Sequence, residues 1–414
     1  MKIIVQKFGG TSLKDEKGRE LAAQHVRRAI SEGYKVVCVV SAMGRSGDPY
    51  ATDTLLRLLG NNDQYVESRE YDLLLSCGEI ISSVVFSNLL KSKEISASAI
   101  TGSQAGFRTN DEHKNARITD MQCERLQSML ETHDAVVVAG FQGEAANGDV
   151  TTLGRGGSDT SASALGAALG AEYIDIFTDV EGVMTADPRI VEDAQPLSVV
   201  TYNEICNMAY QGAKVIHPRA VEIAMQAKVP LRIRSTYSEL PGTLVTSATS
   251  KGAGRDVQDH VITGIAHVPK VTQIKVFARD AQYDLHTNVF KAMAKEQISV
   301  DFFNISPKGV VYTVMENMAE HAEKVLREHG YSPEITRNCA KVSAVGAGMS
   351  GVPGVTARIV EALVNENIQI LQSADSHTTI WVLVRQDDMV KAVNALHRAF
   401  ELHNIHSKGR QLSE

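Results

Sequence analysis

Residues 1–245 alternate short apolar runs with stretches in which apolar residues recur at helical spacing. The apolar runs are rich in Val and Ile and have the length of strands. They cover Lys2–Phe8, Lys35–Met43, Ile95–Thr101, Ala135–Gly140, Tyr173–Thr178 and Leu231–Ser235. The helical stretches are Glu16–Glu32, Tyr71–Lys91, Ser158–Leu169 and Ala213–Lys228. Strands that alternate with helices predict an α/β domain, with a mostly parallel sheet covered by helices on both faces.

The second half of the chain repeats itself. Residues 246–260 lose the apolar pattern and read as a linker. Beyond them Val289–Met293 aligns with Ile359–Leu363, and Val310–Val314 aligns with Ile380–Val384, both at an offset of 70 residues. Each copy reads strand, helix, strand, strand, helix, and one more strand would complete a ferredoxin-like βαββαβ unit. We predict two such modules, residues 261–337 and 338–414, between which strands can be exchanged.

The composition fits a globular protein of several domains. The 414 residues are too many for one ordinary core, and 43% of them are hydrophobic. Forty-two Lys and Arg stand against 49 Asp and Glu, so neither nucleic acid nor an anionic membrane is expected as the main partner. The first residues lack the long apolar run and cleavage site typical of a signal peptide, no run of 18 apolar residues occurs, and the five cysteines form no CxxC pair. These features predict a cytoplasmic protein with reduced thiols.

Three polar loops follow predicted strands. Lys7–Ser12 combines a lysine with adjacent glycines before a helix, an arrangement that suits a phosphate group, although Ser12 could simply cap a tight turn. Leu153–Ser161 places Arg155 between glycines, and here too a helix cap is the simpler alternative. Thr178–Arg189 is the third loop. Since ligands bind beyond the carboxyl ends of strands in open α/β sheets, the three together favour a phosphate-handling site.

Other chemical patterns are weak. Gly346–Gly351 fits GxGxxG, but the equivalent turn of the first repeat has no glycine, so nicotinamide binding is not expected. The thirteen histidines form no HExxH motif and no paired spacing with cysteines, so we expect no metal site built by protein side chains. His217, beside Pro218, could be catalytic but is more often structural at such a position.

Taken together, the motifs resemble those of the aspartate kinases. In the family's order they are Lys7–Ser12, Ser41–Gly44, Ser76–Glu79, Gly154–Asp159, Thr178–Arg189 and Gly212–Val215. The repeat looks like the family's paired ACT modules. The resemblance covers essentially the whole chain and implies an amino-acid-kinase three-layer sandwich followed by two ACT modules. It also implies that ATP phosphorylates the β-carboxylate of L-aspartate to 4-phospho-L-aspartate, the first step towards diaminopimelate, lysine, threonine and methionine.

The resemblance assigns roles residue by residue. The implied catalytic residues are Lys7, Asp159 and Glu79. The implied substrate-binding residues are Thr52, Glu79, Arg155, Gly156, Gly157 and Ser158. The implied nucleotide-binding residues are Lys7, Phe8, Gly9, Gly10, Ser12, Thr178, Asp179, Met184, Arg189, Lys214 and Val215. Mg²⁺ would be held mainly by the nucleotide phosphates, which agrees with the missing metal motif.

One departure concerns the substrate loop. In the family a substrate threonine follows Gly44 within a few residues, whereas here residues 45–51 intervene before Thr52. We assign Thr52 to this role. The turn residues Gly47, Asp48 and Pro49 could shape a mobile lid.

The ACT modules imply control by an end-product amino acid bound across a homodimer or a higher homo-oligomer. Pro353-Gly354 stands at the usual ligand turn of the second copy. The first copy has Gln282 and Asp284 there, so lysine, threonine and diaminopimelate all stay open as effectors. Two other functions are alternatives for the chain. One is that of an acetylglutamate or glutamate 5-kinase, which would lack the tandem modules, and the other is that of a non-catalytic amino-acid sensor. Retention of Lys7, Glu79, Arg155 and Asp159 speaks against the sensor.

Overall fold

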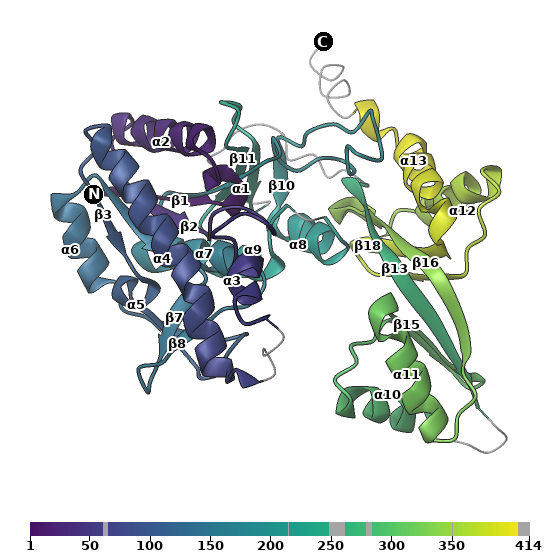
Figure 1. Cartoon of the computed structure of the whole chain (residues 1–414). Coiled ribbons are helices and arrows are strands. Elements are labelled where there is room, and N and C mark those ends of the chain that lie inside the picture. The colour runs from purple at the N-terminus through teal and green to yellow at the C-terminus, as the bar shows by residue number, and fades with distance from the viewer. Residues whose placement is uncertain (61–64, 214, 248–260, 279–283, 350, 405–414) are drawn as a thin grey trace, which may run out of the picture. The chain divides into compact units, whose positions relative to one another are not determined.

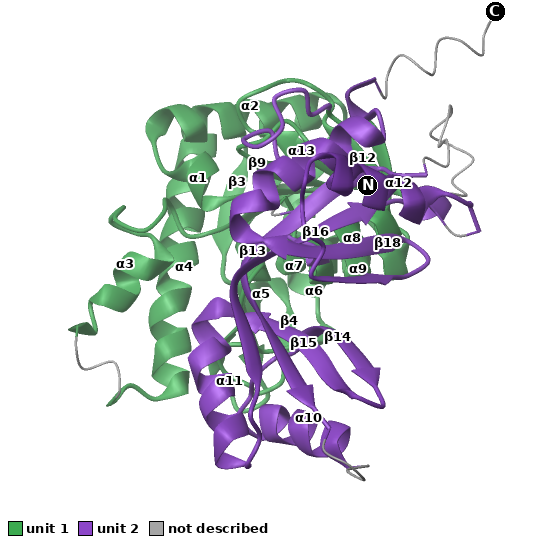
Figure 2. Cartoon of the chain, turned by 90° about the vertical axis from the view of Figure 1, so that its right-hand side faces the viewer, with its two compact units in different colours: residues 1–183, 196–209, 214–257 green, residues 184–195, 210–213, 258–414 purple. Residues whose placement is uncertain are grey.

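The computed structural model describes residues 1–60, 65–213, 215–247, 261–278, 284–349 and 351–404. Figure 1 shows the course of the chain and Figure 2 colours its two compact units. Unit 1 comprises residues 1–183, 196–209 and 214–257. Unit 2 comprises residues 184–195, 210–213 and 258–414. Most of the predicted linker, residues 248–260, lies outside the described residues.

Unit 1 is built on an eight-stranded sheet in the order β10-β12-β11-β9-β1-β2-β6-β3. Its strands are β1 (Lys2–Phe8), β2 (Tyr34–Val40), β3 (Ala97–Ile100), β6 (Ala135–Ala139), β9 (Tyr173–Thr178), β10 (Val199–Thr201), β11 (Leu231–Ser235) and β12 (Thr243–Thr246). Every pair of neighbours is parallel except β11 and β12. The mostly parallel sheet expected from the sequence is confirmed.

Helices bury both faces of this sheet. Alternate residues such as Ile4, Val36 and Val137 form one core with apolar side chains of α2 (Glu16–Ser31) and α4 (Ser68–Ser92). Their chain neighbours Val5 and Val37 are also fully buried. Because successive side chains of a strand point to opposite faces, those neighbours face the other side, where α7 (Gly157–Leu169) packs on β1. Burial on both faces explains why these strands read as unbroken apolar runs.

A second, four-stranded sheet in unit 1 was not predicted. It has the order β5-β4-β7-β8, with β4 (Phe107–Thr109), β5 (Ile118–Met121), β7 (Gln142–Ala145) and β8 (Val150–Thr152). Strands of three or four residues are too short to show an alternating pattern. The last helix of unit 1, α9 (Pro218–Ala227), was predicted. Five shorter helices were not: α1 (Gly10–Leu13), α3 (Thr52–Arg57), α5 (Gly102–Ala105), α6 (Glu124–Thr132) and α8 (Tyr202–Tyr210).

Two predicted boundaries were wrong for identifiable reasons. The second strand ends at Val40 rather than Met43 because the chain turns at Gly44, which has φ +91°, although Ala42 and Met43 prolong the apolar run. The last helix starts at Pro218 rather than Ala213. Proline suits the first turn of a helix, and the side chain of His217 accepts a hydrogen bond from the N–H of Arg219 as the N-cap.

Unit 2 contains a six-stranded antiparallel sheet in the order β14-β15-β13-β16-β18-β17. The strands are β13 (Gly264–Phe277), β14 (Asp301–Ser306), β15 (Gly309–Met315), β16 (Glu334–Val345), β17 (Gln372–Asp375) and β18 (Thr379–Arg385). The helices are α10 (Leu285–Lys295), α11 (Glu316–Glu328), α12 (Val355–Asn365) and α13 (Met389–Ala399), with 3₁₀ turns at Ala347–Met349, Gln386–Asp388 and Leu402–Asn404. The helix and strand pairs α10 and α12, and β15 and β18, keep the offset of 70 residues.

The long central strands β13 and β16 belong to both copies of the repeat. The first half of β13 pairs with the second half of β16, from Gly264 opposite Val345 to Val268 opposite Lys341. The second half of β13 pairs with β15, from Val271 opposite Met315 to Phe277 opposite Gly309. Thus the strand that lies beside β16 in the second copy comes from a segment that precedes the first copy in the sequence.

Residues 184–195 and 210–213 precede residue 245 but cluster with unit 2. Ala186, Val191 and Ala194 lie in one buried core with side chains of α12 and α13. Thr185 Oγ1 is 2.9 Å from Nε2 of the buried His397, and Asn394 donates to the Ile190 carbonyl at 3.1 Å. Unit 1 as a compact body is therefore not the continuous span 1–245 that the sequence pattern suggested.

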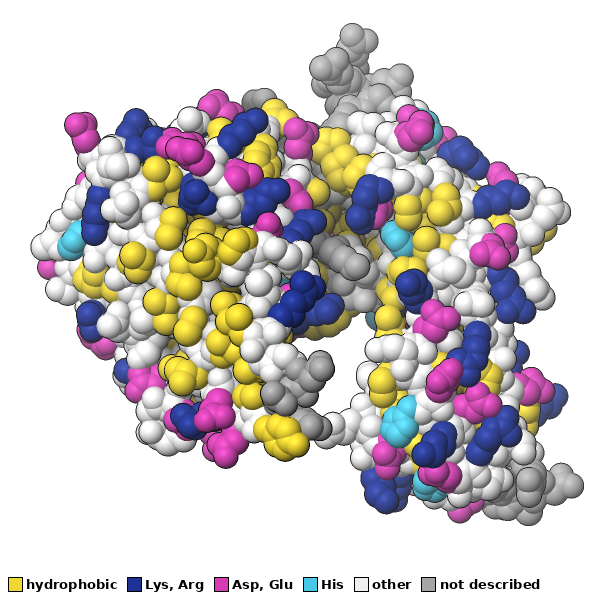
Figure 3. Space-filling view, in the orientation of Figure 1, with side chains coloured by type: hydrophobic (Ala, Val, Ile, Leu, Met, Phe, Trp, Pro, Cys, Tyr) yellow, Lys and Arg dark blue, Asp and Glu magenta, His cyan; other side chains and the backbone are white. Residues whose placement is uncertain are grey.

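The surface mixes both signs of charge, and Figure 3 shows basic and acidic side chains interspersed on one face. Hydrophobic side chains also gather there over unit 1 (Figure 3). By length and composition alone α4 could cross a membrane, with a hydropathy of 1.7 in its most apolar window. However, half of that window is buried, and the helix packs on β3 and β6 with Asp72 and Glu79 inside. These are features of a core helix in a globular domain.

Candidate functional site

A cavity of about 510 Å³ opens in unit 1. The strands β1 and β2 end there, and the first turn of α7 and one face of α4 border it. Its lining residues are Lys7, Gly10, Ser41, Ala42, Gly44, Thr52, Tyr71, Leu75, Glu79, Lys114, Phe141, Thr152, Gly154, Arg155, Gly156, Gly157, Ser158 and Asp159. All three predicted catalytic residues and all six predicted substrate residues are therefore brought together.

An ion pair lies at the centre of the predicted chemistry. Lys7, near the end of β1, places its Nζ 2.7 Å from Oδ1 of Asp159 in the first turn of α7. Both side chains are only 13% exposed. Asp159 Oδ2 also accepts a weak hydrogen bond of 3.4 Å from the backbone N–H of His217. A lysine held in this way presents a fixed positive charge to an anion in the cavity.

Glu79 is buried in the wall of the cavity. Its Oε1 accepts a hydrogen bond of 3.0 Å from the N–H of Ala42, while Oε2 is buried and has no hydrogen-bond partner among the described residues. Burial raises the pKa of Glu79 to about 8, although the Ala42 N–H acts in the opposite direction. A carboxyl group that lines a ligand cavity and has one oxygen without a partner is suited to bind a cation such as an ammonium group.

The second glycine-rich loop leads into α7. Gly154 and Gly156 have φ values of +73° and +71°, and a Cβ on Gly156 would overlap the His217 ring. Arg155 between them is exposed, and among the residues that the structure describes it has no hydrogen-bond or ion-pair partner. Gly157, Ser158 and Asp159 line the cavity with the first turn of α7, where free N–H groups favour an anion. The guanidinium and the helix start thus offer donors to a carboxylate or phosphate.

Only part of the first glycine-rich loop, Lys7–Ser12, lines the cavity. Gly10 lines the cavity and fits closely against the Ser41–Gly44 loop, because a Cβ there would lie 2.5 Å from the Ala42 carbonyl oxygen. Phe8 is fully buried and stacks on Phe177 with ring centroids 4.8 Å apart, so its side chain belongs to the core. Gly9 and Ser12 are not among the cavity-lining residues. The Ser12 hydroxyl is buried against Thr236 Oγ1 at 2.7 Å.

The other predicted nucleotide residues lie outside this cavity. Thr178 Oγ1 accepts from the N–H of Val180 at 2.9 Å, and Asp179 forms an exposed ion pair of 2.7 Å with Arg45. Met184 packs on the core of unit 2, and Arg189, also in unit 2, is exposed and pairs with Asp187. Val215 is half-buried in unit 1. Lys214 lies outside the described residues.

The predicted effector residues belong to unit 2. Asp284 precedes α10 and accepts a hydrogen bond of 2.7 Å from the Asn288 side chain. Pro353 is exposed, and Gly354 has φ +92° at the start of α12. Gln282 lies outside the described residues. Asp284 and Gly354 thus occupy equivalent N-cap positions before α10 and α12.

Several lining residues were missed from the sequence. Tyr71 and Leu75 precede Glu79 at intervals of four residues, so they share its face of α4, and this spacing could have identified them. Lys114 and Thr152 come from the short strands and turns of the second sheet, for which the sequence carries no strong pattern. Phe141 is a non-glycine residue with φ +68°, which nothing in the sequence indicates.

Comparison with known proteins identifies the family. The model of the amino acid kinase family matches residues 2–235, and an ACT domain model matches residues 334–398. The chain is 69% identical over 402 residues to aspartokinase 1 of Bacillus subtilis (strain 168), covering 97% of this chain and 100% of that protein. It is 39% identical over 409 residues to the aspartokinase of Geobacillus stearothermophilus, with 97% and 98% covered.

Solved structures show the same fold. The crystal structure of Escherichia coli aspartokinase III in complex with aspartate and ADP matches with a TM-score of 0.79 at 24% identity, covering 96% of this chain and 99% of that one. Clostridium acetobutylicum aspartate kinase matches with a TM-score of 0.77 at 24% identity, covering 97% and 100%. The α/β fold, the cavity and these relatives agree: the chain belongs to the amino acid kinase family and, within it, to the aspartokinases.

Proposed function

We propose that the cavity of unit 1 is the site at which this aspartokinase binds L-aspartate and the reacting phosphates of ATP. The observation that carries the proposal is the convergence of Lys7, Glu79, Arg155 and Asp159 on one cavity. L-Aspartate has two carboxylates and one ammonium group. Arg155 is suited to clamp the α-carboxylate, Glu79 to accept the ammonium, and Thr52 with Gly156, Gly157 and Ser158 to complete the pocket.

The proposed reaction requires little covalent chemistry from the protein itself. A β-carboxylate oxygen of aspartate attacks the γ-phosphorus of ATP, a new O–P bond forms, and the bond from that phosphorus to the bridging oxygen breaks to release ADP. The acceptor is already ionised at neutral pH, because its pKa is about 4, so no general base is required. The protein has to align two anions and offset the charge on the transferring group. We assign the second task to Lys7, with Asp159 holding its ammonium in place.

Mg²⁺ fits this site if the nucleotide phosphates hold most of it. The ion keeps several waters and usually takes only one or two carboxylates beside substrate phosphates, and Asp159 is a carboxylate that lines the cavity. Bound there, it would neutralise charge on the nucleotide phosphates. No group of three or more His, Cys, Asp or Glu residues in the described ranges could hold a metal ion by itself.

The nucleotide contacts remain proposals. Gly9 and Gly10 are suited to donate backbone hydrogen bonds, and Phe8 could contribute only through its main chain because its side chain is buried. Thr178 and Asp179 follow β9, which is the parallel neighbour of β1, so both loops leave the same edge of the sheet. Ser12, Met184, Arg189, Lys214 and Val215 are assigned to ATP by the family resemblance alone.

Aspartate binding should be linked to the release of a proton from Glu79. Below its raised pKa of about 8 the buried carboxyl is neutral in the free protein, and the substrate ammonium favours the charged form. The KM for aspartate should therefore fall as the pH rises from 6 to 8, by up to about tenfold per unit. Isothermal titration at pH 7 in buffers of different ionisation enthalpy should detect about one proton released per aspartate bound.

Glu79→Gln is the matched variant, since its amide oxygen can still accept from the Ala42 N–H. It should show a higher KM for aspartate that no longer depends on pH in this range. The raised pKa also means that the neutral form contributes to stability fully below pH 4.5, the ordinary pKa of the group, and that this contribution is lost progressively as the pH rises to about 8. A pH-independent KM in the unmodified protein would contradict the role of Glu79.

We infer that unit 2 regulates the enzyme. The shared strands β13 and β16 support two ACT modules that exchange a strand, and such modules usually bind a small amino acid across a homodimer or a higher homo-oligomer. Asp284, Gln282, Pro353 and Gly354 are the candidate effector residues. Titration of lysine, threonine and diaminopimelate against the initial rate should reveal inhibition by at least one of them, of the order of tenfold or more at saturation. Insensitivity to all three would contradict this control.

We also infer that the enzyme works in the cytoplasm. All five cysteines are free, and four of them, Cys38, Cys123, Cys206 and Cys339, are buried. Reduced buried thiols and the use of ATP both suit that compartment.

A further inference from the structure

We propose that Asp72 is a positioning residue for the acceptor side of the cavity. By the acceptor side we mean the part lined by Tyr71, Glu79, Lys114 and Arg155, which we assign to aspartate. Its carboxylate lies on α4, is fully buried and does not line the cavity itself. It would act by fixing the turn that carries Arg155 and the turn that carries Lys114 against the helix that carries Glu79. The inference rests on the proposed assignment of this cavity to aspartate.

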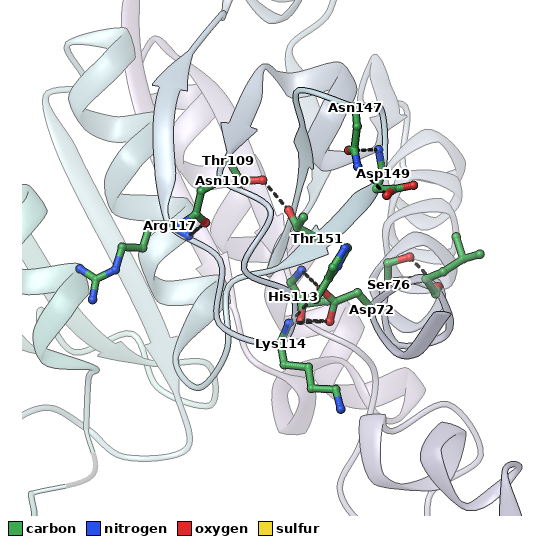
Figure 4. Close-up of polar contacts among 12 residues, drawn as sticks. Asp72, Ser76, Thr109, Asn110, His113, Lys114, Arg117, Asn147, Asp149 and Thr151 are labelled. Atoms are coloured by element: carbon green, nitrogen blue, oxygen red, sulfur yellow. Dashed lines mark hydrogen bonds and ion pairs between the residues drawn. The ribbon is translucent and has the colours of Figure 1, made fainter. Parts of the chain in front are cut away.

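Asp72 is hydrogen-bonded to two segments outside its own helix, and Figure 4 shows its contacts with one of them, at His113 and Lys114. The N–H of Lys114 donates to its Oδ2 and Oδ1 at 3.0 and 3.1 Å. The N–H of Thr152 donates to Oδ2 at 2.9 Å, and the Thr152 hydroxyl donates to Oδ1 at 2.6 Å. His113 Nδ1 lies 3.0 Å from Oδ2. Such charge-assisted hydrogen bonds are short and strong, so the carboxylate joins the three segments firmly.

Lys114 is held in a conformation that non-glycine residues rarely adopt. Its φ is +70°, a backbone conformation that is strained for a side chain other than glycine, and its N–H is the group bound by Asp72. The Lys114 Nζ lies 4.4 Å from the centre of the Tyr71 ring, and both side chains line the cavity. Asp72 thus helps to hold a strained turn that presents a cation to the site.

Thr152 connects Asp72 to the Arg155 loop. It is the last residue of β8, and the loop from Leu153 to Gly156 follows directly. This loop packs on the Lys114 turn, because a Cβ on Gly154 would lie 2.9 Å from Asn115 Oδ1. A displacement of either turn would therefore move Arg155.

Arg219 links the same two turns from another side. Its guanidinium donates to the Leu153 carbonyl at 3.1 Å and to the Ala116 carbonyl at 3.2 Å. The loop is therefore braced by a buried carboxylate that binds N–H groups and by a guanidinium that binds carbonyls.

Asp72 acts on the acceptor side of the cavity only. The same helix presents Tyr71, Leu75 and Glu79 to the cavity. Among the described residues, the hydrogen bonds of Asp72 reach His113, Lys114 and Thr152 and none reaches the nucleotide loops at Gly9–Gly10 or Thr178–Asp179. The loss of the carboxylate should therefore impair aspartate binding more than ATP binding.

Asp72→Asn in the full-length protein tests this role. The amide keeps the shape but turns an NH₂ group towards neighbours that are themselves donors. We expect the KM for aspartate to rise about 10- to 100-fold, the KM for ATP to stay within about twofold, and Tm to fall. An equal change in both KM values, or a lower Tm with an unchanged KM for aspartate, would overturn the proposal.

Thr109→Val is the matched control for a purely structural effect. It removes a buried hydrogen bond of 2.6 Å between Thr109 Oγ1 and Thr151 Oγ1, in the same small sheet and one residue from Thr152 (Figure 4). We expect a lower Tm with both KM values unchanged. If the control raised the KM for aspartate as Asp72→Asn does, general loosening of the sheet would explain both and the proposal would fall.

If Asp72→Asn does not fold, a pair of Thr152 variants tests the positioning role of Asp72 instead. Thr152→Val removes the hydroxyl that donates to Asp72, whereas Thr152→Ser keeps it. The valine variant should raise the KM for aspartate about three- to tenfold over the serine variant, and equal KM values would overturn the proposal. An Arg155→Lys variant with a normal KM for aspartate would instead refute the assignment of the acceptor site itself.

Discussion

Replacement of Lys7 by methionine is expected to lower kcat about 10³-fold. Its ammonium is the cation that the ion pair with Asp159 fixes in the cavity, and the transferring phosphoryl group needs a positive charge in place before the reaction begins. Methionine keeps the length and much of the bulk of the lysine stem. Steady-state kinetics with saturating aspartate and ATP measure the effect.

The fold of the Lys7→Met variant should survive. The backbone of Lys7 lies within β1, paired with Val39 and Ile176 of the neighbouring strands, and its side chain leaves the core for the cavity. Lys14→Met is the matched control, because Lys14 is exposed and lies outside the cavity. It should retain normal kcat. Normal turnover of Lys7→Met with an unchanged circular dichroism spectrum would refute the role of Lys7.

Arg155→Lys should raise the KM for aspartate about 10- to 100-fold and leave the KM for ATP within about twofold. Lysine retains the charge but cannot form the two parallel hydrogen bonds of a guanidinium to a carboxylate. Because Arg155 is exposed and has no partner among the described residues, its replacement should hardly change Tm. Initial rates over a grid of both substrates separate the two constants.

Arg117→Lys is the control, because it makes the same replacement of a guanidinium by an ammonium group at a position outside the cavity. Arg117 is exposed and does not line the cavity. Both KM values should be normal in this variant. If Arg155→Lys raised the KM for ATP alone, the guanidinium would belong to the nucleotide and the proposed orientation of the two substrates would be reversed.

The sequence could predict the frame of the catalytic unit because its strands are buried on both faces. Lys2–Phe8, Tyr173–Thr178 and Leu231–Ser235 have the predicted bounds. The turn that carries Arg155 could be located from Gly154 and Gly156, which adopt positive φ values that few other residues adopt.

The residues on the acceptor side of the cavity could not be predicted in the same way. Tyr71 and Leu75 look like ordinary core residues of an apolar helix, and Lys114 looks like a surface lysine. Hydrogen bonds of Asp72 that span 42 and 80 residues of chain help to bring their segments together, and such long-range contacts leave no pattern in the sequence. The packing of residues 184–195 into unit 2 was equally hidden, because Ala186, Val191 and Ala194 carry no pattern that says which core they join.

The most direct test of the account is ATP-dependent hydroxamate formation by the full-length protein with L-aspartate, L-glutamate and N-acetyl-L-glutamate. We predict product with L-aspartate, none above background with the other two, and loss of product in Lys7→Met. No product with L-aspartate, or product from Lys7→Met at the normal rate, would contradict a site in which Lys7, Glu79 and Arg155 act together on aspartate and ATP.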